Sequence, residues 1–221
     1  RWGKMFVRNF MTKDPITVSL DATLPSTADL MKQHNLKRLP VMDQDKLVGI
    51  ITEKDVAKAL PSPATTLSKY EINYLTEKIR VKDVMTKAVI SVSPDTTVEE
   101  ATMIMHEEDV GCLPVLENGK LVGIITERNI YNALTKLFGL DRPGLRVTVQ
   151  VEDRIGVIAD LTTLIKSLNL PIISLATYAA SAETAYIVVR IATDSPEPLI
   201  GTLTGNGFQV VHWTTLNEQA N

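Results

Sequence analysis

Cysteine is almost missing from this chain of 221 residues, where Cys112 is the single example. One cysteine excludes an intrachain disulfide and any metal site built from several thiolates, and its ordinary role is that of a small buried hydrophobic residue. Long apolar runs are missing too, since none approaches the roughly 18–20 residues needed to cross a bilayer. Residues 1–7 do not resemble a secretory signal peptide. These absences predict a cytoplasmic protein without a membrane partner.

Clusters of basic residues are also missing. The net charge is −3, and no run of five or more Lys and Arg residues occurs, which argues against a nucleic-acid partner. Neither of the glycine-rich phosphate-binding motifs is found. The three histidines, His34, His106 and His212, are far apart and have no second histidine nearby. We therefore expect no metal site and no catalytic residues, so the chain is not predicted to be an enzyme.

An internal repeat is the strongest signal in the chain. Shifting the sequence by 74 positions aligns residues 7–60 with residues 81–134 without a gap, and about 23 of the 54 aligned positions are identical. The first copy begins VRNFMTKDPITVS and the second VKDVMTKAVISVS. Such self-similarity indicates two copies of one supersecondary unit.

Each copy contains signals for both strands and helices. In copy one, alternation predicts a short strand over residues 16–20, and Thr23 is a suitable N-cap for the helix that follows it. Residues 39–42 and 47–51 form a predicted hairpin, and a closing helix is predicted over residues 53–60.

A unit of this size is marginal alone, because small domains bury too little of their surface. We therefore expect the copies, residues 5–60 and 81–137, to pack as one pseudo-twofold domain with two equivalent clefts. The connector, residues 61–80, starts as a loop and continues as a predicted helix over residues 67–79.

The segments GIITEKD and GIITERN, each after LPV and a preceding MT-x-x-x-I-x-V, resemble a tandem pair of CBS domains, a Bateman module. The resemblance implies a regulatory ligand in the clefts, AMP, ATP or S-adenosylmethionine, with no obligatory cofactor. It assigns the contacts with ribose and phosphate to Thr52 and Asp55 in copy one, and to Thr126 and Asn129 in copy two. It assigns the strand that lines the adenine base to Ile16 and Val18, and to Ile90 and Val92.

The chemistry of Asp55 supports this assignment, because a carboxylate can accept charge-assisted hydrogen bonds from both hydroxyls of a ribose. The same Thr-x-x-Asp pattern is also an ordinary helix N-cap, and both interpretations stay open. Asn129 can accept through only one oxygen, so the second cleft is expected to bind more weakly or to be empty.

Lys37 and Arg38 precede the predicted strand of copy one and are candidates for phosphate contacts. The alternative is a pair of solvated surface charges. Copy two has Gly111 and Cys112 at the matching positions. This difference favours the first cleft for a charged ligand.

The C-terminal third has a different pattern. Strands are predicted over residues 145–151, 172–177, 186–192 and 208–213, with helices over residues 158–168 and 198–204. The order is βαββαβ, the ferredoxin-like arrangement. The whole chain is thus predicted to be α+β, a CBS-domain pair followed by a ferredoxin-like domain.

The segment RVTVQVEDRIGVIADLTTLIKSLNLPIISL resembles the opening of an ACT domain, which would cover residues 145–215. The resemblance implies an amino acid ligand near Asp153, Gly156 and Val157, where glycine lets backbone N–H groups approach a carboxylate. The alternative is that Gly156 only permits a tight turn. Exposed sheet edges favour pairing with a second copy, so a homodimer is expected.

Three functions follow from these patterns. The leading one is a regulatory protein without catalysis that senses an adenine nucleotide or adenosyl ligand and acts on another, unknown protein. The order of two CBS units and an ACT unit is similar to that of the acetoin-utilization B-type proteins. The alternatives are a protein–protein adaptor with vacant clefts and an enzyme that hydrolyses a nucleotide.

Overall fold

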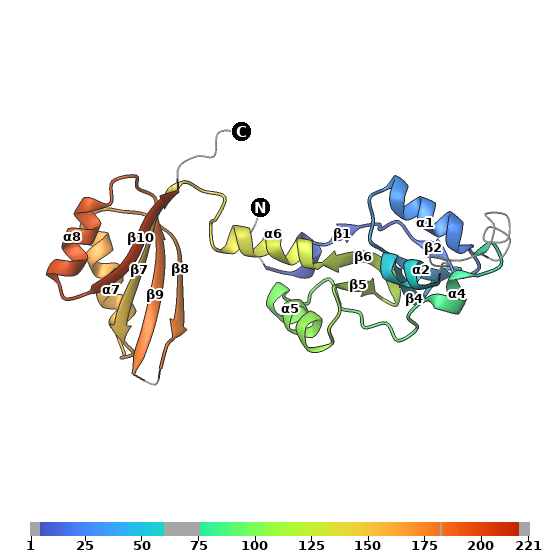
Figure 1. Cartoon of the computed structure of the whole chain (residues 1–221). Coiled ribbons are helices and arrows are strands. Elements are labelled where there is room, and N and C mark those ends of the chain that lie inside the picture. The colour runs from blue at the N-terminus through green and yellow to red at the C-terminus, as the bar shows by residue number, and fades with distance from the viewer. Residues whose placement is uncertain (1–4, 60–75, 182, 217–221) are drawn as a thin grey trace. The chain divides into compact units, whose positions relative to one another are not determined.

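The computed structural model describes residues 5–59, 76–181 and 183–216 and divides the chain into two compact units, Arg1–Tyr131 and Asn132–Asn221 (Figure 1). The predicted connector helix lies almost entirely outside the described residues. Within them, no helix is long and apolar enough to span a membrane. The first unit contains copy one and copy two up to Tyr131, and the second contains the rest of the last helix of copy two and the C-terminal sheet.

Copy one folds as the hydrophobic pattern predicts. Its elements are η1 (Val7–Asn9), β1 (Thr12–Lys13), β2 (Val18–Ser19), α1 (Leu24–Gln33), β3 (Arg38–Asp43), β4 (Lys46–Thr52) and α2 (Glu53–Ala59). The Thr23 hydroxyl accepts a hydrogen bond from the Ser26 N–H at 3.3 Å and so caps α1. The strand predicted over residues 16–20 is shorter than expected, because only β2 pairs with β3, in parallel.

Copy two repeats the helices and the hairpin of this order with α4 (Val81–Val84), α5 (Val98–Glu107), β5 (Cys112–Glu117), β6 (Lys120–Thr126) and α6 (Glu127–Leu137), and it has isolated bridges at Thr86 and Val92 where copy one has β1 and β2. Thr97 caps α5 as Thr23 caps α1. The turn between β5 and β6 places Asn118 and Gly119 at φ 51° and 77°. Two consecutive left-handed residues match the twist of a tight hairpin, which explains the Asn-Gly pair.

The two copies exchange their N-terminal segments. Thr12 of β1, from copy one, lies opposite Ile124 of copy two. Conversely, Thr86 of copy two forms two backbone hydrogen bonds of 2.9 Å with Ile50 of copy one. The ion pairs at this exchange also match, with Arg8 to Asp95 at 2.5 Å and Lys82 to Asp21 at 2.6 Å. Each copy therefore completes the sheet of the other.

A methionine from each exchanged segment packs on a glycine of the opposite hairpin. A Cβ atom at Gly49 would lie 2.5 Å from the sulfur of Met85, and one at Gly123 would lie 2.5 Å from that of Met11. The two glycines thus permit a close approach that a side chain would block.

The second unit is a four-stranded antiparallel sheet in the order β10-β7-β9-β8. Its elements are β7 (Gly144–Glu152), α7 (Val157–Ser167), β8 (Ile172–Ala179), β9 (Thr184–Ile191), α8 (Glu197–Gly205) and β10 (Gln209–Leu216). Both helices cover the same face of the sheet (Figure 1). The predicted ferredoxin-like βαββαβ order is confirmed.

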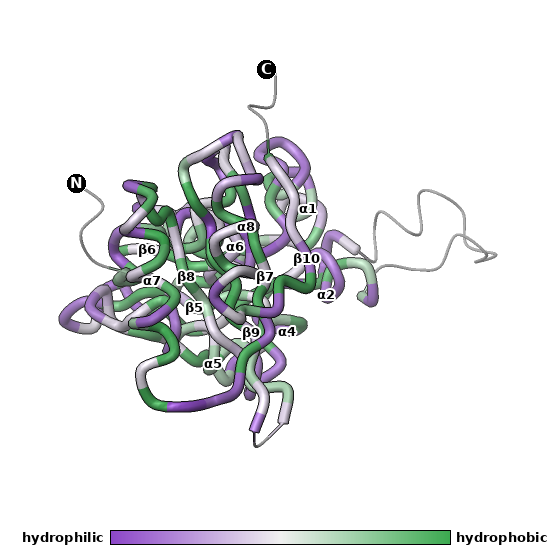
Figure 2. The backbone as a smooth tube through the Cα atoms, turned by 90° about the vertical axis from the view of Figure 1, so that its left-hand side faces the viewer, coloured by the Kyte–Doolittle hydropathy of each residue, from purple (hydrophilic) through white to green (hydrophobic). Residues whose placement is uncertain are grey.

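The core of this unit lies between the helices and the sheet. Alternate residues of β7 and β9 point into it, as the period of two in a strand requires, and Figure 2 shows hydrophobic residues along both strands. Its fully buried members are Leu145, Val147, Val149, Leu161, Ile165, Val189, Ile191, Leu199 and Leu203.

Candidate functional site

A cavity of about 330 Å³ lies in the first unit where the two copies meet. Copy one contributes the start of β3, the end of β4 and the start of α2, and copy two contributes part of residues 86–90 and the loop before β5. This mixture follows from the exchange of N-terminal segments. The lining residues are Lys37, Arg38, Ile50, Thr52, Glu53, Lys54, Thr86, Ala88, Val89, Ile90, Asp109, Val110, Gly111 and Cys112. We call this cavity the first cleft.

Thr52 and Asp55 form a reciprocal cap at the start of α2. The Asp55 Oδ2 atom accepts from the Thr52 backbone N–H at 2.9 Å and from its hydroxyl at 2.6 Å. The Asp55 N–H donates back to the Thr52 hydroxyl oxygen at 3.3 Å. Thr52 and Asp55 therefore do cap α2. All the hydrogen bonds described for the Asp55 carboxylate are accepted by its Oδ2 atom. Thr52 lines the first cleft, whereas Asp55, three residues further on, is half-buried and is not among the lining residues.

Thr126 and Asn129 repeat two bonds of this cap and add a bond to another segment. The Asn129 Oδ1 atom accepts from the Thr126 N–H at 2.9 Å and from its hydroxyl at 2.7 Å. The Asn129 Nδ2 atom donates to the Phe10 carbonyl oxygen at 2.8 Å. The amide of Asn129 thus holds the exchanged segment of copy one, a bond that a carboxylate could not make because it has no hydrogen to donate.

The four apolar candidates are not equivalent in the structure. Ile90 lines the first cleft beside Thr52, although the two residues come from different copies. Val18 and Val92 are 7% exposed and lie in hydrophobic cores. Ile16 is 37% exposed and lies between β1 and β2, outside the lining of the first cleft.

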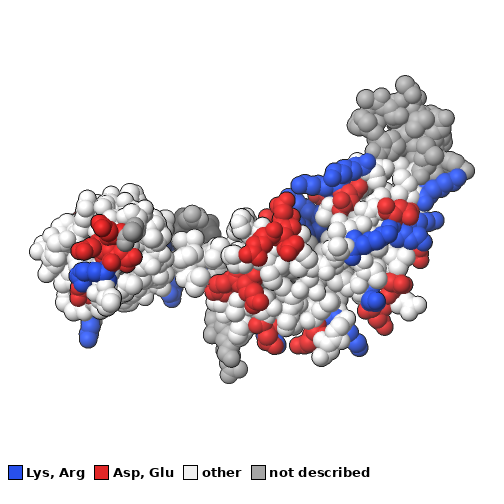
Figure 3. Space-filling model, turned by 90° about the horizontal axis from the view of Figure 1, so that it is seen from below, with Lys and Arg blue, Asp and Glu red and all other residues white. Residues whose placement is uncertain are grey.

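The basic end of the first cleft comes from copy one, through Lys37, Arg38 and Lys54. Residues 7–60 contain eight Lys and Arg against seven Asp and Glu, a net charge of +1. Residues 81–134 contain four against nine, a net charge of −5. In Figure 3 basic side chains gather toward the end of this unit that carries α1 and α2. An anionic group is therefore attracted to the copy-one side of the cleft.

Cys112 lies at the inner wall of the first cleft and is 6% exposed. Burial raises the pKa of its thiol above the ordinary value of 9.0, and the charge of Arg38 opposes this rise. The thiol is thus protonated at neutral pH and behaves as an apolar wall residue. Among the residues that the structure describes, no three His, Cys, Asp or Glu side chains come together as a metal site.

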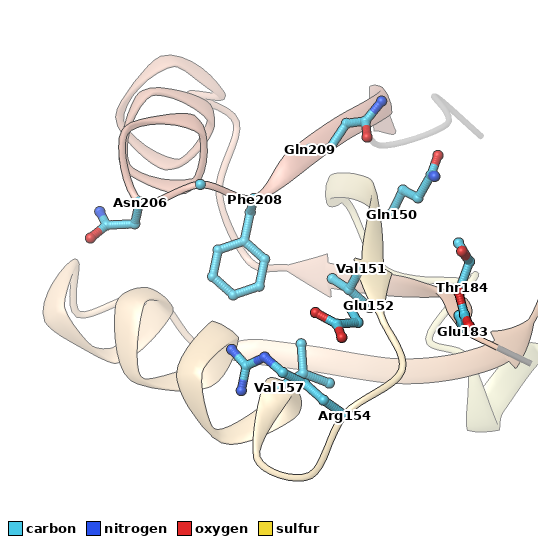
Figure 4. Close-up of a pocket in the computed structure, with 11 residues that line it drawn as sticks. Gln150, Val151, Glu152, Arg154, Val157, Glu183, Thr184, Asn206, Phe208 and Gln209 are labelled. Carbon is cyan, nitrogen blue, oxygen red and sulfur yellow. The ribbon is translucent and has the colours of Figure 1, made fainter.

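A second cavity, of about 510 Å³, lies at one end of the C-terminal sheet. Figure 4 shows the ring of Phe208 and the side chain of Val157 on its inner side, with Glu152 and Arg154 beside them. The Arg154 guanidinium pairs with Asp160 at 2.6 Å. The further lining residues are Gln150, Val151, Glu183, Thr184, Asn206, Gly207 and Gln209.

Of the three residues expected to bind a ligand here, only Val157 lines this cavity. Asp153 is exposed, and its N–H donates to the Glu183 carbonyl oxygen at 3.0 Å. Gly156 has φ 90° and precedes α7, and a Cβ atom there would meet nothing within 4 Å. The left-handed backbone alone therefore accounts for glycine at this position. Sequence reasoning missed Glu152 and Arg154, which flank Asp153 and are charged in the same motif.

Comparison with family models matches both parts of the chain. The model of the CBS domain matches residues 7–62 and 81–136. The model of the TTHA0829-like ACT domain matches residues 143–213.

Similar proteins cover mainly the repeat. A CBS domain-containing protein of Dictyostelium discoideum is 32% identical over 61% of this chain and 94% of its own length. Homoserine O-acetyltransferase of Methanococcus vannielii is 36% identical over 60% of this chain but only 25% of that enzyme. A crystal structure of a putative acetoin utilization protein from Vibrio cholerae has a TM-score of 0.52 and 29% identity, covering 62% of this chain and 95% of its own.

Proposed function

The chain belongs to the CBS-domain family and ends in an ACT domain, and from this premise we propose that it is a regulatory protein that binds an adenosyl ligand in the first cleft and catalyses no reaction. The observation that carries the proposal is the composition of this cleft. Apolar residues, Thr52 with its bond to Asp55, and three basic side chains lie around about 330 Å³.

Each part of the cleft suits one part of an adenosyl ligand. The apolar wall of Ile50, Val89 and Ile90 suits the faces of an adenine ring. The Asp55 carboxylate suits the ribose hydroxyls, since a charged acceptor forms the stronger hydrogen bonds. Lys37 and Arg38 suit phosphate oxygens, and Arg can bind them with two parallel N–H donors.

The regulatory mechanism we propose is a shift of population. A ligand in the first cleft contacts both copies, so it stabilises the arrangement of the copies that fits it best. The size of the shift is limited by the difference in affinity between the two arrangements. A partner protein that recognises one of these arrangements would then respond to the ligand.

The test is titration of the whole chain with AMP, ATP and S-adenosylmethionine, followed by calorimetry and by the change in melting temperature. We expect at least one of them to bind, and Asp55→Asn to weaken its binding about 10- to 100-fold, the range for loss of a charge-assisted hydrogen bond. Asparagine keeps the acceptor oxygen that caps α2, so the variant changes the charge with little effect on folding. Ligands that give no heat and no stabilisation would instead favour an adaptor with vacant clefts.

For the ACT domain we propose an amino acid ligand in the cavity of Figure 4. Arg154 suits a ligand carboxylate, and Glu152 and Glu183 suit its ammonium group, while Phe208 and Val157 supply an apolar floor. A thermal-shift screen of the twenty amino acids checks this proposal. Arg154→Ala is expected to abolish any stabilisation found, and equal stabilisation of both proteins would contradict it.

We also propose a homodimer through β10. This edge strand is eight residues long and exposes Val211, Trp213 and Leu216 by 43%, 47% and 39%. A long apolar edge strand readily pairs with another strand. Trp213→Lys is expected to shift the mass in analytical ultracentrifugation from dimer to monomer, and a wild-type protein that is monomeric at micromolar concentration would contradict the proposal.

A further inference from the structure

Arg38 belongs to copy one, but its guanidinium lies against copy two. Its Nη2 atom is 3.7 Å from the Glu127 Oε2 atom in the first turn of α6. The Arg38 side chain is 23% exposed, while that of Glu127 is 56% exposed. Arg38 therefore spans the junction of the copies and ends at the helix that follows the second Thr-x-x-Asn cap.

Gly111 provides the space for this arrangement. A Cβ atom at Gly111 would lie 2.5 Å from the Arg38 Nη1 atom and 2.8 Å from the Glu127 Oε2 atom. The φ angle of Gly111 is not in the left-handed region, and the matching residue of copy one is Lys37. A side chain at this position would therefore have to displace the guanidinium or the carboxylate, and glycine leaves both in place.

Arg38 also lines the first cleft together with Lys37. An anionic group in the cleft would thus compete with Glu127 for Arg38. The pair with Glu127 is long and partly exposed, and pairs of this kind contribute little. A phosphate can accept two parallel N–H donors from Arg38 and is the stronger partner.

We propose that the Arg38–Glu127 pair is a latch between the two copies, which a phosphorylated adenosyl ligand opens and an uncharged one does not. The inference rests on the proposed function, because it assumes that the first cleft binds adenosyl ligands. Arg38 is then the residue that makes the cleft selective for phosphate. Glu127 opposes phosphate binding, because it holds Arg38 until the ligand takes it over.

The test compares AMP with adenosine by calorimetry on the whole chain. Glu127→Gln releases Arg38 and is expected to tighten AMP binding about two- to fivefold, the range that corresponds to an exposed ion pair. Arg38→Met is expected to weaken AMP binding at least tenfold. Glu127→Gln is expected to leave the affinity for adenosine within a factor of two of the wild type, and Arg38→Met is expected to weaken adenosine binding less than AMP binding.

Glu117→Gln is the matched control, because it removes the same charge from an exposed position of copy two at the end of β5. Gly111→Ala is a second probe, since the added methyl group separates Arg38 from Glu127 without a change of charge. It is expected to alter the affinity for AMP and not that for adenosine.

Two failures can be told apart. If wild-type protein binds none of AMP, ATP and S-adenosylmethionine, the proposed function is wrong and the latch falls with it. If S-adenosylmethionine binds but AMP and ATP do not, the proposed function stands and the latch is wrong. If AMP binds but Glu127→Gln behaves as Glu117→Gln does, or if adenosine binding changes as much as AMP binding, the latch alone is wrong.

Discussion

The two copies of the repeat share a backbone and differ in the side chains at their clefts. Both use a threonine to cap the helix after the hairpin, and both receive a methionine from the other copy over a glycine. Copy one places Asp55, Lys37 and Arg38 at its end of the junction, where copy two places Asn129, Gly111 and Cys112.

This difference teaches that the same local structure can serve binding in one copy and cohesion in the other. In copy two the Asn129 side-chain amide donates a hydrogen bond to the Phe10 carbonyl oxygen. Asp55 has no donor for such a bond, so its carboxylate keeps acceptor capacity beyond the cap. Two predictions test this contrast and two further ones test the roles of Cys112 and Arg190, from the largest expected effect to the smallest.

The cohesive role of Asn129 is tested by Asn129→Asp. The variant loses the donor to Phe10 and places a carboxylate beside a carbonyl oxygen, so the free energy of unfolding should fall by about 1–3 kcal/mol. Asp55→Asn should change it by less than about 0.5 kcal/mol, because the capping oxygen is kept. Urea denaturation of both variants gives the comparison, and equal losses would contradict it.

The shared scaffold is tested by Gly49→Ala and Gly123→Ala. Each added methyl group meets a methionine sulfur at 2.5 Å, so each should lower the free energy of unfolding by about 1–2 kcal/mol. The two losses should agree within about 0.5 kcal/mol, since the contacts are equivalent. Gly201→Ala is the control, because the Cβ position of Gly201 is open. A loss of stability in only one of the two copies would contradict the equivalence of the two contacts.

The apolar role of Cys112 predicts a dependence on pH. Burial raises the pKa of its thiol in the folded state. The contribution of the protonated thiol to the free energy of unfolding is therefore fully present below pH 9, and it is lost as the pH rises through the higher folded pKa. The slope is at most about 1.4 kcal/mol per pH unit. Denaturation between pH 8 and 10.5 should show a steeper loss for wild type than for Cys112→Ala, and parallel curves would contradict the assignment.

A buried charge in the second unit provides the smallest effect. Arg190 is 2% exposed, its Nη2 atom donates to the Arg142 carbonyl oxygen, and its Nε and Nη1 atoms have no hydrogen-bond partner among the residues that the structure describes. Because an unpaired buried charge carries a desolvation cost, Arg190→Met should change the free energy of unfolding by less than about 1 kcal/mol or increase it. A loss above about 3 kcal/mol would show that the charge is compensated.

Much of the fold could be predicted because its signals are local. The repeat, the hairpins, the Thr23 cap and the βαββαβ order all follow from residues close together in the chain. The exchange of N-terminal segments could not be predicted, because the pairing of Thr12 with Ile124 is a long-range contact without a local signal.

The candidate site was predictable in its residue types but not in their grouping. Thr52 and Ile90 belong to different copies, and only the exchange brings them to one cleft. Val18 and Val92 read as site residues by resemblance, yet both are buried in cores. The contact of Arg38 with Glu127 joins residues 89 positions apart, and a charge pattern does not show such a partner.

The central claim is that the first cleft binds an adenosyl ligand through Asp55 while the second does not. Calorimetric titration of the wild type, Asp55→Asn and Asn129→Asp with whichever of AMP, ATP and S-adenosylmethionine binds tests it most directly. We predict one tight site per chain, about 10- to 100-fold weaker in Asp55→Asn and unchanged in Asn129→Asp. Two equal sites, or an unchanged affinity in Asp55→Asn, would contradict the account.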